Sequence, residues 1–236
     1  MADPYTRRRL ALVGALTAAS VGLVGLFAGS DRSDRPDDAG DPARTTTTAV
    51  VSSTTSSTLD AAAIAPTDQF SVAPGASAAV GQGERWTYTV EVEVGIPVDP
   101  AELAALVDSV LADPRGWTAA GGVRLQRVAA DAEPSFRVRL ATPATTDAHC
   151  APLDTYGELS CRNGADVMLN LRRWVEGAAP SEMDLPEYRQ YMVSHEVGHA
   201  LGHDHEECPG PGQLAPVMLQ QTLGLDGCRP NPWPFP

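Results

Sequence analysis

Alternating apolar and polar residues mark the first strong element of the chain, a strand that begins near residue 86. This period of two is typical of a strand with one buried face. The alternating large residues are Trp86, Tyr88, Val90, Val92 and Val94. Similar patterns predict strands at residues 123–128, 136–140 and 167–171. We expect ordered structure to begin near Phe70.

A further strand is expected at residues 156–162, directly before Asn163-Gly164. An Asn-Gly pair between two strand-like segments is the strongest short-range signal for a hairpin. The strands at 156–162 and 167–171 should therefore be antiparallel neighbours.

Two helices are indicated by capping residues and by helical spacing of apolar side chains. Asp99-Pro100-Ala101-Glu102 combines a capping Asp, a Pro in the first turn and an early Glu. A second helix should start near Asp184, with Glu187 three residues later, and run to about Leu201. Strands and helices in this order predict an α/β domain with a mixed sheet.

The N-terminal segment reads as a targeting signal. A basic cluster, Arg7-Arg8-Arg9, precedes residues 10–29, which contain no charged residue. As a helix they would rise about 30 Å, enough to span the membrane as an uncleaved anchor. The positive-inside rule places the basic segment 1–9 in the cytoplasm and the rest outside. The alternative is a signal peptide cleaved near Ala28-Gly29-Ser30, which would release a secreted protein.

Residues 30–67 form a segment rich in Ser, Thr and Pro, and its first part is also rich in charged residues. Such a segment buries too little apolar surface to offset chain entropy, so we expect a disordered linker followed by a folded domain at 68–236. The formal net charge of -13 argues against nucleic-acid binding, which needs a basic face. We expect a monomer.

Four cysteines are predicted to form disulfides, because an exported domain lies in an oxidising compartment. Local closure favours Cys150–Cys161 and Cys208–Cys228. The alternative is a thiolate metal ligand, but the chain contains no CxxC pair.

The most informative motif is His195-Glu196-Val197-Gly198-His199-Ala200-Leu201-Gly202-His203-Asp204-His205. His195 and His199 are four residues apart, so both imidazoles can bind one ion from the same helix face. Glu196 lies where a carboxylate can take a proton from metal-bound water. Gly202 permits a reversal of the chain that brings in a third ligand.

This run resembles the metzincin signature H-E-x-x-H-x-x-G-x-x-H at each fixed position. The resemblance implies a zinc peptidase in which His195, His199 and His205 bind Zn²⁺ and Glu196 is the general base. It also implies a methionine-bearing turn beneath the zinc, with Met218 as the candidate. An antiparallel edge strand at 156–162 would pair with an extended peptide or protein substrate.

The ectodomain also resembles a narrower group of exported, metzincin-like proteins of high-GC Gram-positive bacteria. Besides the metal motif, the segments that carry this likeness are Pro186-Glu187-Tyr188, Cys208-Pro209-Gly210-Pro211-Gly212 and Gly227-Cys228-Arg229-Pro230-Asn231-Pro232-Trp233. Two departures from the metzincin pattern stand out. Some metzincins have a tyrosine two residues after the turn methionine, where this chain has Gln220, and the segment after the third histidine is short.

Several alternatives stay open at this level. His203 rivals His205 as third ligand, Met218 can be an ordinary core residue, and Asp204 belongs either to a solvated cluster or to the partners that orient a ligand imidazole. The leading function is zinc-dependent peptide hydrolysis at the outer face of the membrane. The alternatives are a zinc-containing cell-surface binding protein without turnover and a zinc amidase acting on cell-wall peptides.

Overall fold

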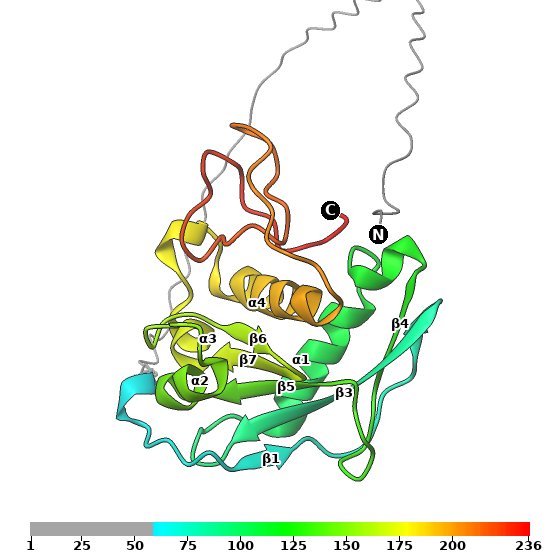
Figure 1. Ribbon diagram of the computed structural model, residues 1–236, viewed down its shortest axis with the longest axis vertical. Helices are drawn as coiled ribbons and strands as arrows, with labels where there is room; N and C mark the ends of the chain where they lie inside the picture. Colours follow the sequence, from blue (N-terminus) through cyan, green and yellow to red (C-terminus); the bar gives the residue numbers. More distant parts are fainter. Residues whose placement is uncertain (1–58) are drawn as a thin grey trace, which may run out of the picture. The chain divides into compact units, whose positions relative to one another are not determined.

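The computed structural model describes residues 59–236, which form one seven-stranded mixed sheet with helices around it (Figure 1). The strands are β1 (Phe70–Val72), β2 (Val80–Gly81), β3 (Glu84–Glu93), β4 (Val123–Arg127), β5 (Phe136–Ala141), β6 (Cys161–Asn163) and β7 (Asp166–Asn170). The α-helices are α1 (Pro100–Ala112), α2 (Pro143–Cys150), α3 (Leu171–Glu176) and α4 (Leu185–Ala200). Three short 3₁₀ helices are η1 (Ala61–Ala63), η2 (Trp117–Ala120) and η3 (Ala179–Ser181).

The sheet has the order β2-β4-β3-β5-β7-β6, and β1 pairs with the C-terminal end of β3. β3, β4, β5 and β7 are parallel neighbours, whereas β1, β2 and β6 pair antiparallel. The predicted α/β class with a mixed sheet is therefore confirmed, as is the antiparallel pairing of β6 with β7.

The main core lies between one face of the sheet and helices α1 and α4. The alternation predicted from residue 86 onward explains this, because Tyr88, Val90 and Val92 all point into the same core. α1 begins where expected, with the Asp99 side chain accepting a hydrogen bond from the Ala101 N–H at 2.8 Å. The opposite face carries a smaller cluster that contains Cys150 and Cys161.

The predicted strand over residues 156–162 is wrong in its first part, since β6 covers only Cys161–Asn163. The preceding residues form a turn instead. The Asp147 carboxylate accepts a hydrogen bond from the Gly157 N–H at 2.8 Å, and Tyr156 has a φ of 56°. A carboxylate from α2 thus bends this segment away from the sheet.

The folded domain begins earlier than the predicted boundary at residue 68. Ala61 is buried in the main core, and Leu59 and Ile64 pack against it. The predicted anchor or signal segment (10–29) and the linker up to residue 58 lie outside the described residues. Within 59–236, no helix combines the length and the hydropathy needed to cross a bilayer.

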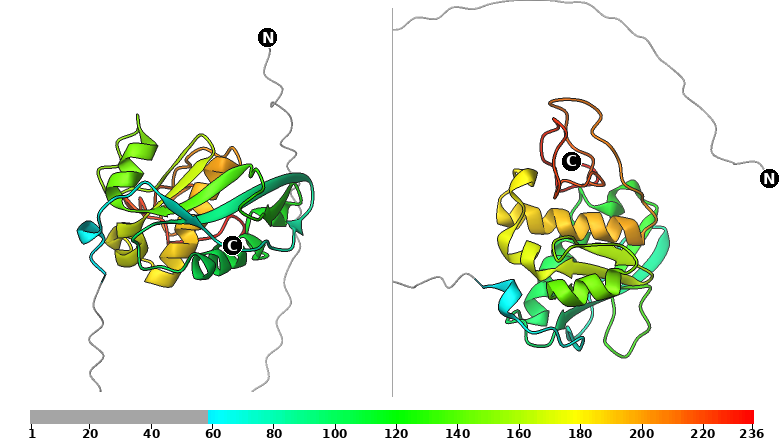
Figure 2. Two further views of the ribbon diagram at one scale, coloured as in Figure 1. Left: turned by 90° about the horizontal axis from the view of Figure 1, so that it is seen from below. Right: turned by 60° about the vertical axis from the view of Figure 1, so that its left-hand side comes forward.

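The chain after α4 contains neither a helix nor a strand of the sheet, as its Pro- and Gly-rich sequence predicts. Figures 1 and 2 show this segment, orange to red, on the side of α4 that faces away from the sheet. Buried side-chain hydrogen bonds hold it there. Gln221 donates to the Asn231 carbonyl at 2.8 Å, and Tyr191 of α4 donates to the Leu219 carbonyl at 2.9 Å.

Candidate metal centre

Helix α4 carries two of the three candidate ligands, His195 and His199. The Asp184 side chain caps the helix by accepting from the Glu187 N–H at 2.9 Å, so the predicted start is confirmed. At the other end Gly202 has a φ of 93°, and the His203 N–H donates back to the Gly198 carbonyl at 3.0 Å. This left-handed glycine reverses the chain toward the helix it has just left.

The reversal brings His205 beside His195 and His199, and the nitrogen atoms that these three rings offer lie within 4.8 Å of one another. Nε2 of His199 and Nε2 of His205 are 3.1 Å apart. Two nitrogens that bind one zinc tetrahedrally at about 2.0–2.1 Å would be separated by about 3.3 Å. The three histidines are therefore grouped so that they can hold a metal ion.

Main-chain carbonyls orient two of the three rings. Nδ1 of His195 donates to the Val217 carbonyl at 2.9 Å, and Nδ1 of His199 donates to the His203 carbonyl at 2.8 Å. Each bond leaves Nε2 without a proton and directs its lone pair into the site. For these two rings the orienting partners are thus carbonyl groups and not Asp204, the candidate considered from the sequence.

The environment favours the neutral form of the imidazoles, which metal ligation requires. Burial lowers the pKa of His195 to about 3, against an opposing contribution from its bond to Val217. Burial also lowers the pKa of His199 and of His205, and the negative charge of Asp204 raises both. All three shifts favour the unprotonated nitrogens that can bind a metal ion.

Glu196 lies beside the histidines and is buried, with 6% of its surface exposed. Among the described residues Oε2 has no hydrogen-bond partner, and burial raises the pKa of this carboxyl to about 8. A buried polar atom without a partner is costly and needs an explanation. A metal ion with a water molecule would supply both a compensating charge and a proton donor, so the residues present fit a metal.

A methionine and a tryptophan support the helix at Gly198, between the two ligands. A Cβ built on Gly198 would lie 2.5 Å from Sδ of Met218 and 2.6 Å from Cζ2 of Trp117. Met218 is fully buried, and its carbonyl accepts from the Glu206 N–H, next to His205. Met218 therefore contacts both the ligand helix and the ligand loop.

Of the two rival third ligands, the structure brings His205 into the group and leaves His203 out. The His203 ring stacks on Trp117, with centroids 4.2 Å apart. Nε1 of Trp117 donates to the Ser194 carbonyl at 2.8 Å. Sequence reasoning missed Trp117, because this contact joins residues 77 positions apart and no local pattern signals it.

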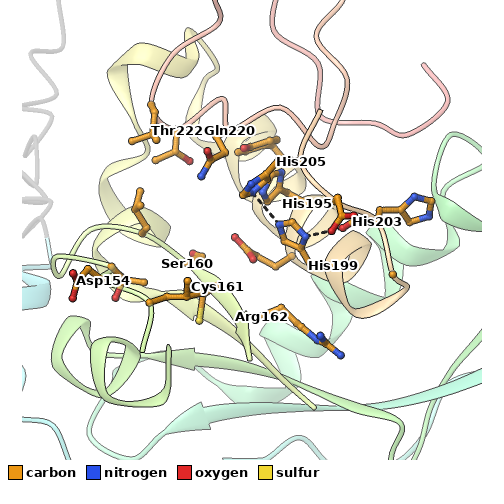
Figure 3. Close-up of a pocket in the computed structure, with 18 residues that line it drawn as sticks. Asp154, Ser160, Cys161, Arg162, His195, His199, His203, His205, Gln220 and Thr222 are labelled. Carbon is orange, nitrogen blue, oxygen red and sulfur yellow. Dashed lines mark hydrogen bonds between the residues drawn. The ribbon is translucent and has the colours of Figure 1, made fainter. Parts of the chain in front are cut away.

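The histidines face a cleft of about 490 Å³ (Figure 3). One wall consists of β6 and the turn before it, with Asp154, Ser160 and Arg162, and the histidines lie across from them. Gln220 and Thr222 of the C-terminal segment line the same cleft. β6 is the edge strand of the sheet, so one side of this wall offers main-chain groups that no strand of the described residues pairs.

Both predicted disulfides are present and both adjoin the site. Cys150–Cys161 ties α2 to the first residue of β6, in the cleft wall. Cys208–Cys228 closes the segment that follows His205. All four cysteines are therefore paired, which leaves no thiolate to serve as a metal ligand.

Comparison with known proteins assigns the chain to a family. Searches of curated proteins and of solved structures found no match to the chain. A family model described as "Protein of unknown function (DUF3152)" matches residues 59–236, the same part that folds into the domain described above. This match covers most of the chain, which therefore belongs to the DUF3152 family.

Proposed function

We propose that this chain is a zinc metallopeptidase of the metzincin type. The observation that carries the proposal is the grouping of three imidazoles around a point beside Glu196, at the wall of an open cleft. Three protein ligands leave one tetrahedral position free, which is typical of catalytic zinc, whereas structural zinc has four protein ligands. Imidazole nitrogens also suit zinc better than calcium or magnesium, which prefer oxygen.

Zinc in such a site supplies a Lewis acid that activates water and polarises the scissile carbonyl. Within the protein, Glu196 would be the general base that takes a proton from the attacking water and then delivers it to the leaving amine. Its surroundings favour this role, because Oε2 has no hydrogen-bond partner among the described residues and so has a lone pair free to take a proton. The carbonyl partners of His195 and His199 would hold both rings in the orientation that metal binding requires.

The substrate is proposed to be a peptide or protein bound in extended form. An edge strand that borders the cleft can add one more strand by main-chain hydrogen bonding, and β6 has this position. The cleft is open at the surface, so a chain segment can enter it from the side.

The proposed location is the outer face of the cell membrane. It rests on the basic cluster and the apolar segment at residues 1–29. The two disulfides are compatible with an oxidising compartment.

The decisive experiment uses the purified ectodomain with one equivalent of zinc. Glu196→Gln is expected to retain the metal and to lose at least about a hundredfold in peptide hydrolysis, the usual contribution of a general base. Glu187→Gln is the matched control, since Glu187 is exposed on the same helix. Undiminished turnover in Glu196→Gln would reject the assignment.

The same preparation separates the alternatives. Peptide libraries and cell-wall muropeptides are incubated with the wild-type protein, with and without chelator. Chelator-sensitive cleavage of muropeptides alone would support the amidase, and retention of zinc without any cleavage would support a binding protein.

A further inference from the structure

Arg162 is the only arginine among the described residues that line the cleft. It lies in the middle of β6, opposite Val167 of β7. Val167 belongs to the core beneath α4, and directly paired residues point to the same face of a sheet. The Arg162 side chain therefore lies on the α4 side of the edge strand.

Its two neighbours on β6 point to the other face. Cys161 is bonded to Cys150 of α2, and the Asn163 amide donates to the carbonyls of His149 and Ala151. This alternation leaves Arg162 as the one side chain of β6 that reaches into the space between strand and helix. Figure 3 shows Arg162 beside His199 at the rim of the cleft.

The guanidinium of Arg162 has no hydrogen-bond or ion-pair partner among residues 59–236, unlike the two arginines of β5. Arg137 and Arg139 both form ion pairs with Asp166, and Arg139 also bonds Glu91. Arg162 is thus an exposed positive charge with free donors, in a chain whose formal net charge is -13.

We propose that Arg162 binds a carboxylate of the substrate and so selects peptides that carry one near the scissile bond. A guanidinium presents its N–H groups as a planar fork that matches both oxygens of a carboxylate. The position fits, since a peptide paired with β6 would pass between Arg162 and the histidines. The carboxylate comes either from an acidic side chain or from a free C-terminus. This inference rests on the proposed function only for the placement of the peptide in the cleft.

Binding is measured with zinc-loaded Glu196→Gln protein, so that turnover does not enter. The probes are short, fluorescently labelled alanine-glycine peptides with an amidated C-terminus and one Glu, Gln or Lys placed at each position in turn. A further series lacks the charged side chain and has a free C-terminal carboxylate. Fluorescence anisotropy gives each Kd, and the two carboxylate series distinguish the two sources.

In the Glu196→Gln protein with Arg162 intact, at least one carboxylate series is expected to bind about tenfold more tightly than the Gln series. The added substitution Arg162→Gln should remove this preference and leave the binding of Gln peptides unchanged. Arg162→Glu should shift the preference to Lys peptides. Arg124→Gln is the matched control, because Arg124 is exposed on β4, lacks a side-chain partner among the described residues and does not line the cleft.

Three results would overturn the inference: no preference for carboxylates with Arg162 intact, an equal loss for all peptides in Arg162→Gln, or no peptide binding at all. Zinc content and the thermal midpoint, measured for each variant, verify that the site is intact. A carboxylate preference in binding together with a wild-type protein that cleaves no peptide would reject the proposed function and leave this inference standing.

Discussion

Trp117 links the two halves of the metal centre. Its indole stacks on the His203 ring at 4.2 Å, and its Nε1 donates to the Ser194 carbonyl at 2.8 Å. Ser194 precedes the first ligand, and the His203 carbonyl orients the second. One side chain from η2 thus fixes both the helix and the turn that follows it.

Replacement of Trp117 by phenylalanine should weaken metal binding. The change removes the bond to Ser194, at a cost of about 1 kcal/mol in the free energy of unfolding, and loosens the stack that holds the turn. Zinc affinity by chelator competition and unfolding in urea measure both effects. Trp86→Phe is the control, because Trp86 lies away from the cleft on β3. Equal zinc affinity for Trp117→Phe and the wild type would contradict this role.

Gly198→Ala should destabilise the domain by about 1–3 kcal/mol, the usual cost of an extra group in a filled core. The added Cβ would lie too close to Met218 and Trp117, so either the helix or both supports must shift. Gly122→Ala is the matched control, since a Cβ there would meet no atom within 4 Å. Similar urea midpoints for the two variants would show that the packing around Gly198 can accommodate a Cβ atom.

His205→Ala and His203→Ala should differ in metal content. Loss of His205 removes one of the three converging nitrogens, and the protein should no longer retain one equivalent of zinc after dialysis. Loss of His203 removes the stack on Trp117 but leaves the orienting main-chain carbonyl in place, so this variant should bind zinc more weakly than the wild type and still retain it after dialysis. Elemental analysis of both variants decides between them, and the opposite ranking would make His203 the third ligand.

The buried carboxyl of Glu196 predicts a pH-dependent stability in the metal-free protein. Its pKa is raised from 4.5 to about 8 by burial, so the folded state binds the proton more tightly than the unfolded state. The contribution of this group to the free energy of unfolding therefore falls as pH rises from about 4.5 to 8, by on the order of 5 kcal/mol in total. Below pH 4.5 the group is protonated in both states and the dependence ends.

Glu196→Gln removes this titration. In the presence of chelator the variant should be more stable than the wild type at pH 8, and the difference should vanish near pH 4. Urea unfolding at a series of pH values measures it. Two parallel stability curves across this range would show that the carboxyl is not protonated at neutral pH in the folded protein.

Removal of the second disulfide should affect metal binding as well as stability. Cys208 lies three residues after His205, and the bridge to Cys228 closes a separation of 20 residues. The paired replacement of Cys208 and Cys228 by serine should lower the free energy of unfolding by about 3 kcal/mol. It should also speed the release of zinc to a chelator, because the loop with the third ligand is less restricted. An unchanged release rate would show that Met218 and Trp117 suffice to hold the loop.

The elements that sequence predicts well are those with local causes. The capping side chain of Asp184 and the positive φ of Gly202 mark the two ends of α4. Asn163-Gly164 likewise marks the β6–β7 hairpin. The missed features have distant causes. Asp147 of α2 bends residues 156–160 out of the sheet, and a site contact of Trp117 depends on a partner 77 residues away.

The short elements β1, β2, α2 and α3 were also absent from the sequence prediction. They have too few residues for a period to be visible. For the candidate site, helical spacing predicts His195 and His199 together, whereas the preference for His205 over His203 rests on the resemblance to the metzincin signature. The structure groups these three histidines. The free guanidinium of Arg162 was not foreseeable, because an absence of partners is a property of the folded neighbourhood.

Because two disulfides hold parts of the candidate metal centre, its rigidity depends on whether these four cysteines are oxidised. One reaches into the cleft wall at Cys161 and the other follows the third histidine. In a reducing cytoplasm both bridges would stay open, and a newly synthesised chain would hold neither its substrate strand nor its ligand loop firmly. Under the proposed function, such a peptidase would lack full activity in the cytoplasm, where it is made, and would gain it only after export.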